Sequence, residues 1–186
     1  LAENRFRISP SKLHIVLGVS VISPINDILG LAQHLLHGQA IAKTTILNPP
    51  IFVLGHWRSG TTLMHELLEL DQRFASPNTY QCFAPWHFLL TEWAMLRFGN
   101  FLLPKKRPMD NMEVGWSHPQ EDEFALLSLG APTPYRRIAF PREPVPHLTT
   151  LGSSTFTSEE LVLWKSNMDW FLRALTYHFQ KPLIIK

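Results

Sequence analysis

The organising segment of this chain reads Ile51-Phe52-Val53-Leu54-Gly55-His56-Trp57-Arg58-Ser59-Gly60-Thr61-Thr62. Residues 51–54 form an unbroken apolar run, which is typical of a short strand buried on both faces in a parallel sheet. Gly55 ends this run, residues 58–60 indicate a turn, and residues 61–63 begin a helical pattern. A strand, a glycine-bounded loop and a helix N-terminus supply inward-pointing N–H groups and a partial positive charge. This order therefore predicts a phosphate-binding loop.

The spacing of the loop is close to that of the nucleotide-binding pattern G-x-x-x-x-G-K-[ST]. Gly55 and Gly60 fit the pattern, but Thr61 stands where the lysine is required, and the cation is Arg58 instead. The change makes ATP or GTP hydrolysis less favoured, and it favours a diester-like or singly charged end group held by Arg58, Ser59, Thr61 and Thr62. At these residues the chain resembles the sulfotransferases, in which an R-[ST]-G-T-T loop binds the 5′-phosphosulfate of 3′-phosphoadenosine 5′-phosphosulfate (PAPS). The resemblance implies that the donor site consists of His56, Trp57, Arg58, Ser59, Gly60, Thr61 and Thr62.

Composition favours one folded domain. The chain has 186 residues, of which 45% are hydrophobic and 17% charged, so it can bury a core. A formal net charge of +2 gives no basis for nucleic-acid binding, which we do not expect. The single cysteine, Cys82, excludes an internal disulfide and a zinc site built on thiolates, and we expect it to be buried.

Both ends of the chain suggest a portion of a longer protein. The sequence starts at Leu1 without a methionine, and Leu183-Ile184-Ile185-Lys186 reads as a strand that has just begun. We predict a helix-rich α/β fold with a P-loop-like parallel sheet flanked by helices, truncated at its C-terminus. Residues 1–186 form one incomplete sulfotransferase-like domain, with a helical extension in 1–48 and the cofactor-loop part of the core in 49–186.

Residues 13–36 are strongly apolar and long enough to cross a membrane. Pro24, Asn26 and Asp27 interrupt the run, so we expect two helices that break near Ser23-Pro24, the second ended by Gly38. Peripheral contact with a membrane and a transmembrane span both stay open. A single cysteine and the lack of a signal peptide favour a cytoplasmic location.

Three further helices follow from apolar spacing. Leu63, Leu67 and Leu70 predict a buried stripe on the helix behind the loop, with His65 facing away. An aromatic helix is expected from Pro85 to Gly99, either as core or as the wall of an apolar acceptor pocket. Residues 157–160 read as a capping box before a helix that ends near Phe179.

The segment His118-Pro119-Gln120-Glu121-Asp122-Glu123 is the best place for a general base. Pro119 at the first helical position and acids in the first turn also suit an ordinary helix start. Sulfuryl transfer is faster when a side chain takes the acceptor's proton, which His118 or a carboxylate can do. Resemblance to bacterial sulfotransferases with a P-Q-E-D-E segment implies Glu121 or Glu123 as substrate-side residues.

The resemblance also gives Lys186 a role, because the matching strand of related sulfotransferases leads to a lysine beside the transferred group. A second site for the 3′-phosphate is missing from this sequence, so the chain alone is expected to be incomplete as an enzyme. The predicted function is sulfuryl transfer from PAPS, without a metal, to a hydroxyl or amine of a small molecule, carbohydrate or lipid. The catalytic residues would come from Arg58, His118, Glu121, Glu123 and Lys186. A P-loop kinase and a catalytically silent binding module are the alternatives.

Overall fold

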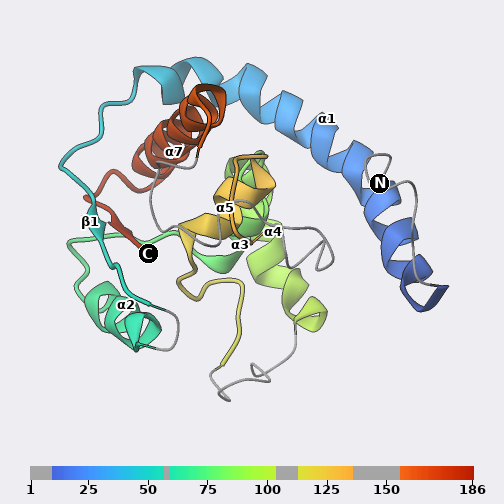
Figure 1. Ribbon diagram of the computed structural model, residues 1–186, viewed down its shortest axis with the longest axis horizontal. Helices are drawn as coiled ribbons and strands as arrows, with labels where there is room; N and C mark the ends of the chain where they lie inside the picture. Colours follow the sequence, from blue (N-terminus) through green and yellow to red (C-terminus); the bar gives the residue numbers. More distant parts are fainter. Residues whose placement is uncertain (1–9, 57–58, 104–112, 136–155) are drawn as a thin grey trace.

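The computed structural model describes residues 10–56, 59–103, 113–135 and 156–186 of the chain. The helices and strands, in chain order, are η1 (Pro10–Lys12), α1 (Leu13–Lys43), β1 (Ile51–Phe52), α2 (Thr61–Glu69), α3 (Thr79–Phe83), α4 (Phe88–Phe98), η2 (Gly99–Leu102), α5 (Asp122–Ser128), α7 (Ser158–Phe179) and β2 (Ile184–Ile185). Figure 1 shows α1 running along the rim of the molecule, with α3, α4 and α5 at the centre and the two strands at the opposite side. The fold is thus helix-rich α/β, as predicted.

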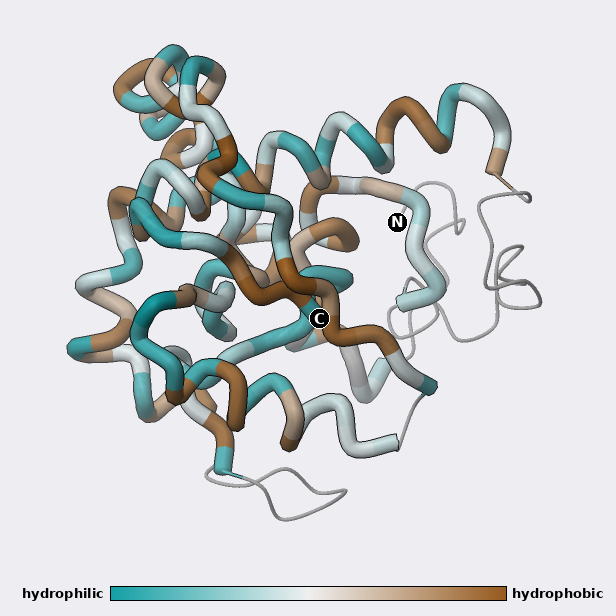
Figure 2. The backbone as a smooth tube through the Cα atoms, turned by 90° about the vertical axis from the view of Figure 1, so that its left-hand side faces the viewer, coloured by the Kyte–Doolittle hydropathy of each residue, from teal (hydrophilic) through white to brown (hydrophobic). Residues whose placement is uncertain are grey.

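The two strands form a small parallel sheet. Ile51 pairs with Ile184 and Phe52 with Ile185. On its other side β2 is bonded to the segment at Ala75, whose carbonyl accepts from the Ile184 N–H at 2.9 Å. Figure 2 shows these hydrophobic strand residues close to the C-terminus. The parallel strand predicted at the end of the chain is therefore confirmed.

The expectation that residues 51–54 are buried on both faces is wrong. Ile51 and Phe52 are 41% and 46% exposed, whereas Ile184 and Ile185 are fully buried. The reason is position in the sheet: within the described residues β2 has neighbours on both sides and β1 pairs with β2 alone.

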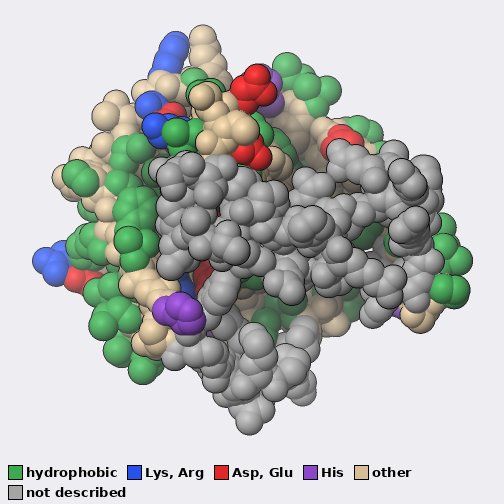
Figure 3. Space-filling view, in the orientation of Figure 1, with side chains coloured by type: hydrophobic (Ala, Val, Ile, Leu, Met, Phe, Trp, Pro, Cys, Tyr) green, Lys and Arg blue, Asp and Glu red, His purple; other side chains and the backbone are tan. Residues whose placement is uncertain are grey.

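The face of α2 that packs is the opposite of the predicted one. His65 is buried, and its Nε2 lies 3.1 Å from the Ser76 hydroxyl. The predicted stripe of Leu63, Leu67 and Leu70 is exposed instead. Figure 3 shows hydrophobic side chains at the surface on the left, the side on which Figure 1 places β1 and α2. Helical spacing identifies an apolar face, but the strand that α2 contacts lies on its other side.

Residues 13–43 form one continuous helix, so the expected break at Pro24 and the end at Gly38 are also wrong. A proline inside a helix removes one backbone hydrogen bond. Tertiary contacts offset this loss, because the Gln33 side chain accepts from the Leu89 N–H at 2.9 Å and Ile41 is buried in the core.

The core forms where α3, α5 and α7 meet β2. Its fully buried members include Cys82, Phe88, Leu126, Phe171 and Leu175. Burial of Cys82 is as predicted and raises the pKa of its thiol. The capping box that begins α7 is confirmed, since the Thr157 hydroxyl accepts from the Glu160 N–H and the Glu160 carboxylate accepts from the Thr157 N–H.

The aromatic helix α4 exists, although it begins at Phe88 rather than at Pro85. Core packing, one of the two predicted explanations of its aromatic content, holds for Phe88 but not for Trp93 and Phe98, which are exposed. Pro119 is not helical either, because it bridges Asn78 and α5 begins at Asp122.

Candidate active site

The loop between β1 and α2 is folded tightly around Gly55. A Cβ atom at position 55 would lie 2.5 Å from Thr61 Cγ2 and 2.8 Å from Ser59 Oγ. Gly60 adopts the left-handed conformation with φ of 89° and is the N-cap of α2, where its carbonyl accepts from the Met64 N–H at 3.1 Å. Both glycines of the predicted loop are thus required by its geometry.

Ser59 holds the turn of the loop together through two hydrogen bonds. Its N–H and its hydroxyl both donate to the carbonyl oxygen of His56, at 3.1 and 2.5 Å. Ser59 therefore stabilises the turn, and its donors are engaged within the loop in this structure. The predicted donor-site residues Trp57 and Arg58 lie outside the described residues.

Lys186 connects this loop to the rest of the site. Its Nζ donates to Thr62 Oγ1 at 2.7 Å and lies 2.9 Å from Glu121 Oε1. The backbone of Lys186 is fixed as well, because its carbonyl accepts from the Asp122 N–H at 3.0 Å. The first turn of α2, the end of β2 and the start of α5 thus meet at one ammonium group. Only 8% of the Lys186 side chain is exposed.

This arrangement favours an anion next to Thr62. The first N–H groups of a helix have no acceptor within the helix, and the helix dipole adds partial positive charge there. The Thr62 oxygen already accepts from Lys186, so its own O–H proton points away from the ammonium and can donate to another group. Backbone donors, a hydroxyl and an ammonium are thus concentrated at the start of α2.

Glu121 is held through both oxygens of its carboxylate. Oε1 faces Lys186, and Oε2 accepts a hydrogen bond from the Tyr135 hydroxyl. The Tyr135 ring also contacts Phe124, with 4.9 Å between the ring centroids. Tyr135 was not predicted from the sequence, because a tyrosine that follows Thr133 and Pro134 carries no local signal for contact with Glu121.

His65 interacts electrostatically with Lys186 and is neutral near pH 7. Burial, followed by the positive charge of Lys186, lowers the pKa of His65 from 6.5 to about 4. A neutral imidazole adds no competing positive charge beside Lys186. The sequence did not indicate this position of His65, because the apolar spacing of α2 predicted that His65 is exposed to solvent.

The other predicted acid–base residues interact with different partners. Burial raises the pKa of Glu123, a rise opposed by its hydrogen bond with Thr133. His118 interacts electrostatically with Glu69, at the far end of α2 from Thr62. The backbone of His118 is tied to α3, since its carbonyl accepts from the Thr79 N–H at 2.8 Å. Of the proposed bases, Glu121 is the one in contact with Lys186.

Asp122, next to Glu121, is buried in the core rather than directed at the loop. Burial, with a smaller contribution from Glu123, raises its pKa from 3.8 to about 7. The helix dipole would act in the opposite direction, so at this helix start the loss of water outweighs the dipole.

Comparison with known proteins agrees with this geometry. A sequence model of the sulfotransferase family matches residues 49–127, which include the loop and the segment around Glu121. The full chain is 42% identical to a mycobacterial sulfotransferase. Over these residues the chain is similar to the sulfotransferase family.

The mycobacterial proteins, from Mycobacterium bovis and Mycobacterium tuberculosis, are named omega-hydroxy-beta-dihydromenaquinone-9 sulfotransferase. In both cases the 42% identity extends over 186 residues, which is 100% of this chain and 48% of the relative. The chain thus spans about half the length of these curated relatives. No solved structure shows significant similarity to it.

Proposed function

We propose that the protein transfers a sulfuryl group from PAPS to an acceptor hydroxyl or amine. The observation that carries this proposal is the contact of the Lys186 ammonium with both Thr62 and Glu121. The Lys186 ammonium thus connects the loop before α2, which is suited to a phosphosulfate, with the Glu121 carboxylate, which is suited to take a proton. The finer fold assignment, a P-loop-like core in residues 49–186 with a helical extension in 1–48, is part of the same proposal.

The residues of the loop fit the anionic end of PAPS. The start of α2 offers backbone N–H groups, and the hydroxyls of Thr61 and Thr62 add donors beside them. His56, Trp57 and Arg58 complete the predicted donor site, in which Ser59 and Gly60 hold the loop closed. Two cations, Lys186 and the predicted Arg58, would balance the charge of the phosphosulfate.

In the proposed reaction the acceptor oxygen or nitrogen forms a bond to sulfur, and the bond from sulfur to the bridging oxygen of the donor breaks. The electron pair of the broken bond stays on that oxygen, which leaves as part of adenosine 3′,5′-bisphosphate. Lys186 and Arg58 would stabilise the developing negative charge. No metal ion is invoked at any step.

Glu121 is the general base in this proposal, the residue that takes the proton from the acceptor hydroxyl or amine. A proton acceptor must lie within hydrogen-bond reach of the reacting group. The 2.9 Å separation between Glu121 and Lys186 supports this assignment, whereas Glu123 is hydrogen-bonded to Thr133 and His118 interacts with Glu69. Glu123 and His118 remain the alternative bases.

A lipid is the acceptor class that we propose to test first, ahead of small water-soluble molecules and carbohydrates. The mycobacterial relatives carry the name of a hydroxylated dihydromenaquinone. Exposed aromatic side chains on α4, such as Trp93 and Phe98, are also suited to an apolar acceptor. The cytoplasmic location of the site remains a prediction.

The test is a transfer assay with the full-length protein and radiolabelled PAPS. Acceptors should include a hydroxylated polyprenyl quinone, its analogue without the hydroxyl, and a soluble phenol. Label transfer to the hydroxylated acceptor alone is expected. Failure of every acceptor with a protein that binds the donor would remove the acceptor assignment, and failure to bind the donor would remove the proposed function.

A further inference from the structure

Three polar side chains of α1, those of Asn26, Gln33 and His37, are turned towards the protein. The Gln33 side chain is 1% exposed, accepting from the Leu89 N–H at 2.9 Å and donating to the Pro85 carbonyl at 3.5 Å. Four residues further on, His37 Nδ1 lies 3.1 Å from the Tyr177 hydroxyl. One helical face therefore carries hydrogen-bonded polar groups that hold α1 against α4 and α7.

The opposite face of α1 is apolar and exposed. Residues two positions apart lie about 200° apart around a helix, so Ile28 and Leu35 point away from Asn26 and Gln33. We define the outer face as Leu17, Val21, Ile28 and Leu35, which are 59%, 68%, 68% and 74% exposed. A helix on a water-soluble domain has the reverse pattern, with apolar residues inward and polar residues outward.

Charge is distributed to suit an anionic lipid surface. Between Lys12 and Lys43 the sequence has a single formally charged residue, Asp27, and Arg5 and Arg7 precede Lys12. Cations at both ends of an apolar segment are complementary to anionic headgroups, while the uncharged middle can enter the layer below them.

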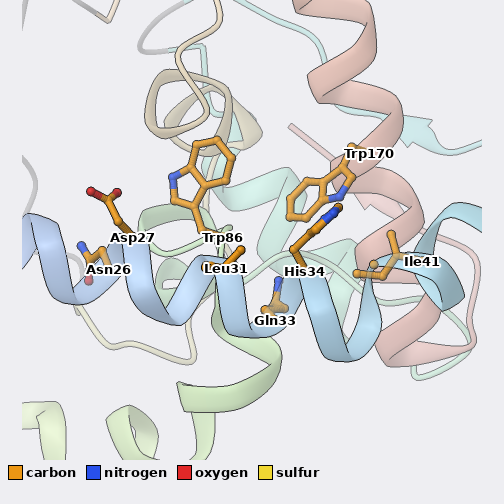
Figure 4. Close-up of a pocket in the computed structure, with 10 residues that line it drawn as sticks. Asn26, Asp27, Leu31, Gln33, His34, Ile41, Trp86 and Trp170 are labelled. Carbon is orange, nitrogen blue, oxygen red and sulfur yellow. The ribbon is translucent and has the colours of Figure 1, made fainter.

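A pocket along the flank of α1 contains two tryptophan side chains that also suit a membrane surface. It has a volume of about 370 Å³ and includes Trp86 and Trp170, whose ring centroids are 6.3 Å apart. Figure 4 shows both indole rings beside α1, near His34 and Leu31. Indole side chains are enriched at the boundary between lipid and water.

We propose that the outer face of α1 docks on an anionic lipid bilayer with the helix lying in the membrane plane. This surface is separate from the site at Lys186, and the proposal does not depend on sulfuryl transfer.

The packing of α1 against the protein favours a helix that lies on the membrane over a helix that spans it. One helix in the part of the chain that the structure describes is long and apolar enough to cross a membrane, and it is α1. Contacts from Asn26 to Ile41 hold that half against the protein, as the hydrogen bond of Asn26 with His87 and the burial of Ile41 show. Residues 13–25 alone would span about 20 Å at 1.5 Å per residue, whereas a hydrocarbon core needs about 30 Å.

Vesicle co-sedimentation tests the proposal in the full-length protein. The wild type is expected to sediment with vesicles of phosphatidylcholine and phosphatidylglycerol, and less with phosphatidylcholine alone. The double variant Ile28→Glu/Leu35→Glu should lower the partition coefficient by about tenfold or more, since it replaces by anions two exposed aliphatic side chains that the proposal inserts into the bilayer. The matched control is Val162→Glu/Leu163→Glu on α7, also exposed and apolar, which should bind as the wild type does.

A labelling experiment covers the case in which the glutamate variant does not fold. Cys82 is the single cysteine and is buried, so Leu35→Cys and Leu17→Cys can each carry an environment-sensitive dye. Both labels should shift to the blue when anionic vesicles are added, and a label at Val162→Cys should not. External dithionite should reduce both α1 labels, as expected for a helix in the plane of one leaflet.

Three results would overturn the proposal. The wild type could remain in the supernatant with all vesicles, or the α7 control could lose binding as much as the α1 variant does. Alternatively, sedimentation velocity without lipid could show a dimer that Ile28→Glu/Leu35→Glu dissociates, which would make a second copy the partner of this face.

Discussion

Replacing Lys186 with methionine would remove the ammonium group that connects Thr62 to Glu121. Methionine keeps much of the length and apolar character of the lysine stem, so the change is mainly one of charge. Loss of one preorganised donor to a developing anion typically lowers kcat by about 10²–10³-fold. We expect a decrease of that size in label transfer from PAPS, with a smaller change in KM.

The same substitution has a cost in stability that can be measured separately. Without Lys186, Glu121 keeps its bond from Tyr135 but loses its ionic partner. Because the Glu121 side chain is 26% exposed, water can replace part of that contact, and a loss of about 1–2 kcal/mol in the free energy of unfolding is expected. Urea denaturation of the variant provides this value.

Lys181→Met is the matched control. Lys181 is exposed, and its Nζ donates to the Gln72 carbonyl at 2.8 Å, away from the loop. It should leave turnover and stability close to those of the wild type. A Lys186→Met protein that keeps turnover within about threefold of the wild type would refute the role of this ammonium, because the smallest loss expected of such a donor is about a hundredfold.

Four other predictions test neighbouring parts of the site. Thr62→Val should weaken donor binding by about tenfold by calorimetry, as expected for a lost hydrogen bond to a charged group, and Thr62→Ser should restore it. Tyr135→Phe should lower kcat about tenfold by leaving Glu121 less well positioned, with donor affinity unchanged; an equal loss of both would contradict this role. Gly55→Ala should abolish donor binding while circular dichroism stays native, since the added Cβ would lie 2.5 Å from the next helix. Asp122 has a folded-state pKa of about 7, above its ordinary 3.8, so its contribution to stability should fall as pH rises from about 4 to 7; Asp122→Asn should flatten that fall in urea denaturation series.

The local parts of the site could be predicted from the sequence. An apolar run, two glycines and paired threonines describe a strand, a turn and a helix start, and each of these depends on neighbouring residues only. The capping box before α7 is local in the same sense. The family resemblance added Lys186, which pairs with Thr62 from 124 positions away.

What could not be predicted depends on packing between distant segments. Apolar spacing on α2 indicated a face but not the side on which β2 lies, so His65 was assigned to solvent although it is buried. Tyr135 approaches Glu121 only because the chain turns back after α5, with Gly130 in the left-handed conformation at φ of 79°. Asn26 was one of the residues that predicted a break in α1, whereas in the structure its side chain contacts His87 and helps to hold the helix in place.

The central claim is that the loop before α2 binds a PAPS-type nucleotide. Calorimetric titration of the full-length protein with adenosine 3′,5′-bisphosphate, with and without Mg²⁺ and with ATP for comparison, tests it most directly. We expect the bisphosphate to bind independently of Mg²⁺ and more tightly than ATP. Preference for ATP with Mg²⁺ would contradict this account in favour of a kinase, and failure to bind either nucleotide would favour a binding module without catalysis.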